Sequence, residues 1–285
     1  MHFATRLHDK VQSKKSPLCV GLDPHWEKIP DHIKAANQNE VKAIEQFLCA
    51  IIEGVKDHCA CVKPNLAFFE VWGADGWSVL EKVSLYAKQH DLEVIADAKR
   101  NDIGSTAAKY AEAFLGADKP YDALTITPYL GSDGILPFQK IADTNVKGLF
   151  ALCKTSNPSS GEIQDLIIGD TLLHEEMGRM ISRWGSVNLD QQNFSSLGAV
   201  VGATYADEMR ILRREMPGQV FLIPGYGAQG GSAADVKPAF YKNGTGAIIN
   251  SSRGILFASE GQDFAEKAGE AARKSAEELW EVATA

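Results

Sequence analysis

The feature that most constrains the fold of this chain is an alternation of short β-type runs with helical patterns along nearly its whole length. Eight runs rich in apolar residues are predicted strands: 18–22, 60–62, 92–96, 123–126, 148–152, 199–201, 220–223 and 247–249. Strands that alternate with helices pair in parallel, because each helix returns the chain to the starting edge of the sheet. The alternation therefore predicts an α/β fold.

The segments between these runs show the three-and-four spacing of amphipathic helices. The clearest case runs from Val41 to Val55, where apolar residues recur on one face. Similar patterns predict helices at 77–89, 105–114, 205–215, 233–241 and 263–282. Eight strands with interleaved helices favour a (β/α)8 barrel, the TIM-barrel fold, with its active site at the carboxyl ends of the strands.

The alternative fold is a doubly wound open sheet, which usually carries a Gly-rich dinucleotide turn after its first strand. Here that strand ends in Gly21-Leu22-Asp23-Pro24, which lacks such a turn. Barrels commonly reach this length undivided, so we expect one domain over 1–285. The segment 156–196 is too long for an ordinary loop, and helical patterns at 162–168 and 172–184 predict an excursion over the barrel mouth.

Composition argues against several functions. The 29 basic residues are outnumbered by 37 acidic ones, a net charge of -8, so we expect no nucleic-acid surface. The first 15 residues lack the apolar core of a signal peptide or membrane span, and no membrane association is expected. The five cysteines lie mostly in apolar runs and are odd in number, which fits the cytoplasm better than a disulfide framework.

Charged residues gather at the predicted carboxyl ends of the strands. Asp97, Lys99 and Asp102 follow one apolar run, and Lys63 follows another. A strand points alternate side chains to opposite faces, so Asp97 and Lys99 are predicted to point the same way. Two ammonium and two carboxylate groups are tolerated in one partly desolvated pocket only when they neutralise one another. These four residues form a candidate catalytic array, with a structural ion-pair network as the alternative.

A second informative region is the Gly-rich segment 224–231, which precedes a predicted helix. Glycines at a helix entrance expose backbone N–H groups that can hold a phosphate. Arg253 follows the eighth strand and could hold the same phosphate with paired donors. The loops after the last two strands are the usual phosphate site of such barrels. We therefore predict a phosphate site, with a Gly-rich turn and a surface arginine as the alternative.

The sequence resembles the orotidine 5'-monophosphate decarboxylase family, and in particular its longer-chain bacterial members. The resemblance extends from about 18 to 254 and depends on one motif and on single residues in the family's order. The motif is Asp97-x-Lys99-x-x-Asp102-Ile103-x-x-Thr106, and the other matches are Asp23, Lys63, the 224–231 segment and Arg253.

The resemblance implies loss of carbon dioxide from C6 of orotidine 5'-monophosphate, giving uridine 5'-monophosphate in pyrimidine biosynthesis, without a metal or an organic cofactor. Lys99 is then expected to oppose the negative charge that develops at C6 and to donate the proton that replaces the carboxylate. Asp97 is expected beside the departing carboxylate, where it orients Lys99. Lys63 and Asp102 complete the array.

The resemblance also implies how the nucleotide binds and how the protein assembles. The implied substrate-binding residues are Asp23, Ile103, Thr106, Ser156, Pro224, Gln229, Ser252 and Arg253. Asp23 is expected at the ribose, Ser156 or its neighbour Thr155 at the pyrimidine edge, and Arg253 at the phosphate. Gln229 is expected to bridge ring and phosphate. Asp102, Ile103 and Thr106 are expected to reach the site of a partner subunit, which implies a homodimer with shared sites.

Two other functions compete with decarboxylation. A sugar-phosphate lyase or aldolase such as hexulose-6-phosphate synthase shares the Asp-x-Lys-x-x-Asp motif but uses magnesium, for which acidic ligands are expected at the early strand ends. Lys63 at the second strand end disfavours such a site. A non-catalytic phosphate sensor is the other alternative, but Asp97, Lys99 and Asp102 are all present.

Overall fold

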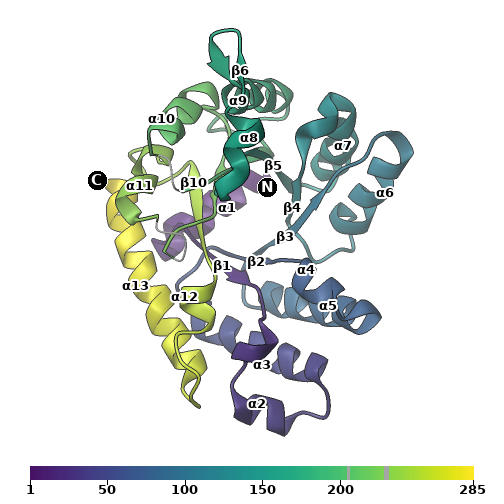
Figure 1. Cartoon of the computed structure of the whole chain (residues 1–285), viewed down its shortest axis with the longest axis vertical. Coiled ribbons are helices and arrows are strands. Elements are labelled where there is room, and N and C mark those ends of the chain that lie inside the picture. The colour runs from purple at the N-terminus through teal and green to yellow at the C-terminus, as the bar shows by residue number, and fades with distance from the viewer. Residues whose placement is uncertain (204–205, 228–230) are drawn as a thin grey trace.

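The computed structural model describes residues 1–203, 206–227 and 231–285. Its centre is a closed barrel of parallel strands in the order β1-β10-β9-β8-β5-β4-β3-β2 (Figure 1). These strands are β1 (Leu18–Leu22), β2 (Cys61–Pro64), β3 (Glu93–Arg100), β4 (Ala123–Ile126), β5 (Gly148–Lys154), β8 (Leu197–Val201), β9 (Phe221–Ile223) and β10 (Ala247–Ser251). Each predicted strand overlaps one of them, and the predicted (β/α)8 barrel is confirmed.

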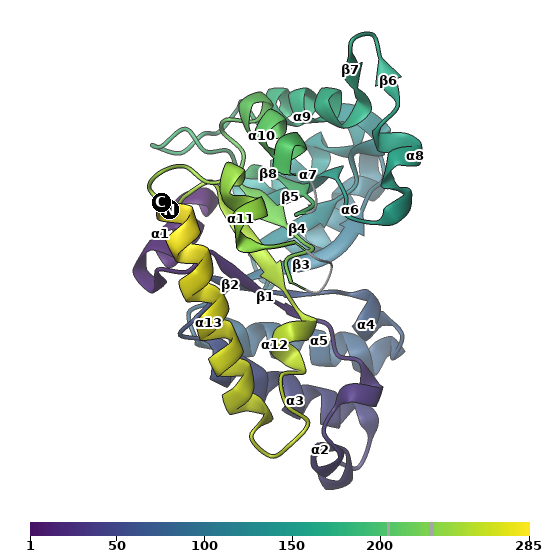
Figure 2. The same ribbon diagram turned by 60° about the vertical axis from the view of Figure 1, so that its left-hand side comes forward.

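Helices surround the barrel in both ribbon views (Figures 1 and 2). The α-helices are α1 (Phe3–Lys14), α2 (Asp31–Ala36), α3 (Glu40–Val55), α4 (Ala67–Glu70), α5 (Gly73–Gln89), α6 (Gly104–Leu115), α7 (Leu136–Thr144), α8 (Gly161–Gln164), α9 (Leu173–Trp184), α10 (Ala206–Glu215), α11 (Ala233–Val236), α12 (Arg253–Leu256) and α13 (Phe264–Thr284). Short 3-10 helices are η1 (Trp26–Lys28), η2 (Pro128–Gly134), η3 (Pro158–Ser160) and η4 (Lys237–Ala239). In the described part of the chain, no helix has both the length and the apolar character needed to cross a membrane.

Helix α1 closes the amino-terminal end of the barrel. Its Phe3, Leu7 and Val11 are buried and belong to one apolar cluster with residues that point into the barrel, such as Phe150. The rings of Phe3 and Phe150 meet edge to face with their centroids 6.1 Å apart. The four-residue spacing of these apolar residues is a helical signal that the predicted helices did not include.

Two predicted helices are wrong in part. The pattern at 162–168 ends early, because Ile167–Ile168 (β6) pairs antiparallel with Thr171–Leu172 (β7) around the two-residue Gly169-Asp170 connection. The pattern at 233–241 gives only α11 and then η4, because Pro238 has no backbone N–H to continue an α-helix.

The segment between β5 and β8 combines η3, α8, the β6–β7 hairpin and α9. Helix α9 packs on β5, β8 and α10, so it occupies the place of a regular barrel helix. The hairpin projects outward at the edge of the molecule in both views (Figures 1 and 2). This segment therefore contains one helix of the outer ring, α9, and a hairpin that projects away from the barrel.

Candidate active site

A cavity of about 710 Å³ opens at the carboxyl ends of the barrel strands. It brings together residues from both halves of the chain, as expected for the mouth of a parallel barrel. The predicted site residues that line it are Asp23, Lys63, Asp97, Lys99, Ser156, Pro224, Ser252 and Arg253. Gln229 lies outside the described residues.

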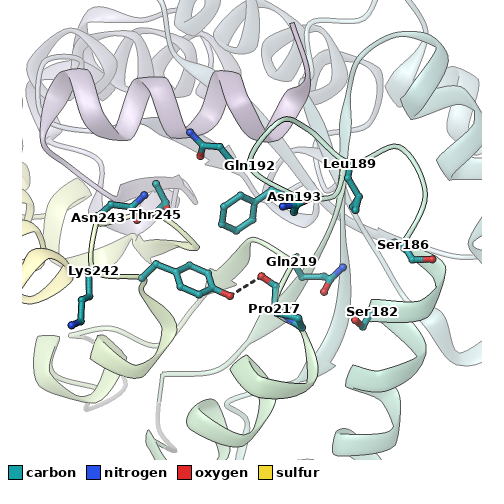
Figure 3. A pocket seen from close by; sticks show the side chains of 14 residues that line it. Ser182, Ser186, Leu189, Gln192, Asn193, Pro217, Gln219, Lys242, Asn243 and Thr245 are labelled. Atoms are coloured by element: carbon teal, nitrogen blue, oxygen red, sulfur yellow. Dashed lines mark hydrogen bonds between the residues drawn. The ribbon is translucent and has the colours of Figure 1, made fainter.

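A larger cavity, of about 870 Å³, lies near the opposite end of the barrel (Figure 3). Its walls include Phe194, Gln219 and Tyr241, and the Tyr241 hydroxyl donates a hydrogen bond to the Pro217 carbonyl at 2.7 Å. Lys242 is the one charged residue in its described lining, and none of the predicted site residues is there. Chemistry rather than size therefore identifies the mouth as the candidate site.

The centre of the mouth is a carboxylate shared by two lysines. Lys63 Nζ lies 2.6 Å from Asp97 Oδ2, and Lys99 Nζ lies 2.6 Å from Asp97 Oδ1. The side chains of Lys63 and Asp97 are almost fully buried, whereas that of Lys99 is 48% exposed. Lys99 is thus the member of this array that a molecule in the cavity can contact most directly.

The charges of this array shift the pKa values of Asp97 and Lys63. Burial alone would raise the pKa of Asp97, but the ammonium groups of Lys63 and Lys99 outweigh it and hold that pKa well below its ordinary value. Burial alone would lower the pKa of Lys63, but the carboxylates of Asp97 and Asp23 outweigh it and raise that pKa. Asp97 therefore stays ionised, and Lys63 stays protonated, through the neutral range.

Lys99 reaches this position through an irregularity in β3. Its backbone is left-handed, with φ of 47°, and the register of β3 against β4 shifts between Ala96 and Arg100. A left-handed residue other than glycine costs roughly 1–2 kcal/mol. The predicted meeting of the Asp97 and Lys99 side chains is confirmed, but a bulged strand produces it, not regular alternation.

Thr125, on β4, is a site residue that the sequence reasoning missed. Its hydroxyl donates to Asp97 Oδ1 at 3.0 Å and accepts the backbone N–H of Lys99 at 2.9 Å. Thr125 is 1% exposed, so water does not compete for these bonds. A buried threonine in a strand is common, and nothing in the sequence distinguished this one.

The structure does not bring Asp102, Ile103 and Thr106 into the cavity of their own chain. Asp102 Oδ1 accepts the backbone N–H of Ile103 at 2.8 Å, and Ile103 is 54% exposed. Thr106 is exposed on α6. The predicted pocket of four charges is therefore wrong for a single chain, because Asp102 lies beyond the end of β3 and outside the Lys63–Asp97–Lys99 array.

Asp23 and Ser252 lie at neighbouring strand ends in the mouth. Asp23 Oδ1 is buried and has no hydrogen-bond partner among the described residues, a costly state that a ligand hydroxyl would relieve. Ser252 packs against the backbone of β1, since a Cβ placed on Gly21 would lie 1.9 Å from Ser252 Oγ. Glycine at position 21 is therefore required for this approach.

The described part of the 224–231 segment has the backbone that glycine permits. Gly225 and Gly227 have φ of 101° and 72°, values that other residues rarely adopt. Between them, the Tyr226 hydroxyl donates to Glu278 of α13 at 3.0 Å and so ties the segment to the last helix. Pro224 at its start and Arg253 beyond β10 line the same cavity.

One group of possible metal ligands lies behind the mouth. Asp165, His174 and Glu208 place one ligand atom each within 4.8 Å of one another. The ammonium of Lys154 already contacts Asp165 and lies 3.7 Å from Glu208. His174 Nδ1 faces the carbonyl of Gln164 at 2.9 Å, so this nitrogen carries the proton and has no lone pair for a metal. The Lys154 ammonium thus already neutralises the two carboxylates of this ion-pair network, and His174 packs beside them.

The parallel barrel, the Lys63–Asp97–Lys99 array and the Gly-rich loop that shares its cavity with Arg253 define the class of this protein. It is a (β/α)8-barrel enzyme with its reactive groups at the barrel mouth.

The chain belongs to the Orotidine 5'-phosphate decarboxylase / HUMPS family, whose model matches residues 16–268. An orotidine 5'-phosphate decarboxylase of Rhodopirellula baltica is 43% identical over 281 residues, covering 95% of this chain and 93% of that protein. Another, of Leptospira interrogans, is 41% identical and covers 96% and 94%. The solved structure of Leishmania donovani OMP decarboxylase is 32% identical, with a TM-score of 0.80 and full coverage of both chains.

Proposed function

We propose that this protein converts orotidine 5'-monophosphate to uridine 5'-monophosphate in pyrimidine biosynthesis. The observation that carries the proposal is the carboxylate of Asp97 held between Lys63 and Lys99 at the barrel mouth. The names of the similar proteins from Rhodopirellula baltica and Leptospira interrogans support the same reaction.

The chemical problem is the electron pair left when the carboxylate leaves C6. The bond between C6 and the carboxylate breaks, carbon dioxide departs, and the pair stays on C6 in an orbital that the ring cannot delocalise. The ammonium of Lys99 stabilises this charge electrostatically and then donates a proton to C6. The resulting amine recovers its proton from water.

Asp97 and Lys63 fix the positions of the charged groups before the substrate binds. Because Asp97 stays ionised, it keeps the ammonium of Lys99 oriented and places a negative charge near the substrate carboxylate. Thr125 fixes both partners, since its hydroxyl bonds the side chain of Asp97 and the backbone of Lys99. Preorganised charges of this kind cost no reorganisation during the reaction.

The rest of the nucleotide spans the cavity. Asp23 accepts a ribose hydroxyl and Ser156 bonds the pyrimidine edge. Arg253 holds the phosphate with backbone N–H groups near it, and Gln229 bridges the ring and phosphate regions. Pro224 and Ser252 line the same cavity. The phosphate lies away from the bond that breaks, so its binding energy can order the catalytic groups.

The test is turnover of orotidine 5'-monophosphate, followed by the absorbance change of its ring, in the presence of a metal chelator. We expect full activity under these conditions. The family also includes HUMPS members, so a sugar phosphate with magnesium is the matched control substrate. Turnover of that control, with none of the nucleotide, would overturn the proposal.

We also propose a homodimer in which Asp102, Ile103 and Thr106 complete the partner's site. Exposed apolar side chains support it: Ile103, next to Asp102, is 54% exposed, and Leu136, which lines the same surface hollow as Ile103, is 52% exposed. Mixing Lys99→Ala and Asp102→Ala chains tests the sharing, because a mixed dimer contains one intact site. Activity should reappear on mixing two inactive variants, and its failure to do so would exclude shared sites.

We further propose a reducing compartment, the cytoplasm. The five cysteines are all free thiols, and Cys19, Cys59, Cys61 and Cys153 are buried.

A further inference from the structure

One side chain of the excursion, the segment 156–196, holds the loop 155–157 that follows β5. Gln164, at the end of α8, accepts the backbone N–H of Thr155 through Oε1 at 2.9 Å and donates from Nε2 to Thr155 Oγ1 at 2.8 Å. The Thr155 hydroxyl in turn donates to Asn157 Oδ1 at 2.6 Å. Thr155 thus uses its N–H, its hydroxyl proton and a hydroxyl lone pair within the protein.

These bonds bear on the choice between Thr155 and Ser156 at the pyrimidine. The Thr155 hydroxyl would have to give up its bond to Asn157 before it could donate to a ligand. Ser156 lines the mouth cavity and packs against Gly202, the residue after β8, since a Cβ placed on Gly202 would lie 3.1 Å from Ser156. The loop is therefore held on one side by the excursion and on the other by the barrel.

Gln164 is held in turn by the ion-pair network behind the mouth. Its carbonyl accepts from His174 Nδ1 at 2.9 Å, and its neighbour Asp165 contacts His174 at 3.1 Å. Asp165 also contacts the ammonium of Lys154, which is 1% exposed at the end of β5. A buried ammonium keeps its partners because losing one leaves its charge uncompensated. The network thus joins the excursion rigidly to the strand that carries the loop.

We propose that Gln164 is a positioning residue that sets loop 155–157 for recognition of the pyrimidine ring, with Lys154, Asp165 and His174 as its anchor. This inference rests on the proposed function, because it names the excursion as a part of the same nucleotide site. The excursion then acts as a fixed support for the ring end of the site, and the ribose and phosphate end does not depend on it.

The experiment compares two probes, uridine 5'-monophosphate and ribose 5-phosphate, which share the phosphate and differ by the ring. Gln164→Met removes both hydrogen bonds and keeps the side-chain length. We expect it to weaken binding of uridine 5'-monophosphate about tenfold, the equivalent of one or two lost hydrogen bonds. Binding of ribose 5-phosphate should change less than about twofold, and the KM for orotidine 5'-monophosphate should rise more than kcat falls. Asp165→Asn should weaken the anchor and have a smaller effect in the same direction.

Matched variants separate positioning from the alternatives. Ile163→Ala, at an exposed position of α8, should leave both probes unchanged, and thermal unfolding checks that each variant is folded. Thr155→Ser keeps the hydroxyl and should bind normally, whereas Thr155→Val should resemble Gln164→Met. Loss of ring binding in Thr155→Val but not in Gln164→Met would mean direct contact by Thr155 and would overturn the inference. Equal loss of both probes would overturn it as well.

Failure of the proposed function is a separate outcome. A wild-type protein that binds both probes but does not release carbon dioxide from orotidine 5'-monophosphate refutes decarboxylation. The probe comparison would still decide the role of Gln164.

Discussion

The two ends of this barrel bury polar groups in opposite ways. At the mouth, Lys63, Asp97 and Lys99 are charged and neutralise one another beside an open cavity. At the amino-terminal end, burial lowers the pKa of His8, on α1, to about 4, so this side chain is neutral at pH 7. Arg213 at the same end donates to backbone carbonyls, among them Gly246 and Gln219.

The difference shows that the residues that stabilise the fold and the residues suited to chemistry lie at opposite ends of the barrel. The amino-terminal end, here called the sealed end, packs α1 on the barrel interior, which stabilises the fold. Its buried polar atoms His8 Nδ1 and Gln219 Oε1 have no hydrogen-bond partner among the described residues. The mouth keeps a strained backbone at Lys99 and an unpartnered oxygen on Asp23, features that a substrate can use. We therefore expect substitutions at the mouth to change turnover and those at the sealed end to change stability.

The largest effect is expected for Lys99→Ala. Loss of both the electrostatic and the proton-donating role should lower kcat/KM by about 10,000-fold or more, roughly 5 kcal/mol of transition-state stabilisation. The free energy of unfolding should hardly change, because the side chain is half exposed and its backbone is strained. Steady-state kinetics and urea unfolding measure the two effects. Near-normal turnover would refute the role of Lys99.

Phe3→Ala tests the opposite end. Removing a ring buried against Phe150 should lower the free energy of unfolding by about 3–5 kcal/mol. Turnover per folded molecule should stay normal at low temperature, because the mouth is untouched. Phe3→Leu, which fills more of the space, should lose less. Lower turnover with an unchanged free energy of unfolding would contradict this assignment of stability to one end and chemistry to the other.

The protonation of His8 should make the sealed end sensitive to acid. Its pKa of about 4 when folded, against 6.5 for the ordinary side chain, means that the unfolded chain binds a proton that the folded chain does not. Stability therefore falls as the pH falls from 6.5 towards 4, by about 2 kcal/mol at pH 5. In His8→Gln this part of the pH dependence of unfolding should vanish. An unchanged slope would mean that His8 is charged in the folded protein.

Thr125→Val should have the smallest effect. It tests whether Thr125 positions Asp97 and Lys99 at the mouth. Losing the hydroxyl removes one bond to Asp97 and one to Lys99, which should reduce kcat about tenfold, roughly 1.4 kcal/mol. KM should change little, because Thr125 acts through these two residues. Thr125→Ser should restore kcat. A change in KM alone would indicate that Thr125 contributes to substrate binding instead.

Much of the fold could be predicted because strand and helix periodicities are local. The predicted bounds 18–22 and 123–126 coincide with β1 and β4, and the predicted helix 41–55 differs from α3 by one residue at its start. The predictions failed where local signals competed. At 162–168 an apolar run suits a helix or a strand, and a hairpin partner decided between them.

From the residues alone, the candidate site was predictable mainly in its charged members, and Ser156, Pro224 and Ser252 came from the family resemblance. The sequence indicated Lys63, Asp97 and Lys99 because charged residues in or directly after apolar strand runs are easy to recognise. Thr125 and Gln164 could not, since neutral polar residues of these types occur throughout proteins. The placement of Asp102 outside its own pocket depends on where the chain turns after β3.

By itself the sequence determined the alternating elements, the barrel they form and the charges at its mouth, because these follow from periodicity and from the convergence of parallel strand ends. Only the tertiary structure decided that Thr125 links Asp97 to Lys99 and that Gln164 holds Thr155. The physical reason is that a hydrogen bond acts over about 3 Å in space. The separation of two residues along the sequence does not say whether they come within that distance. Only the folded chain decides it.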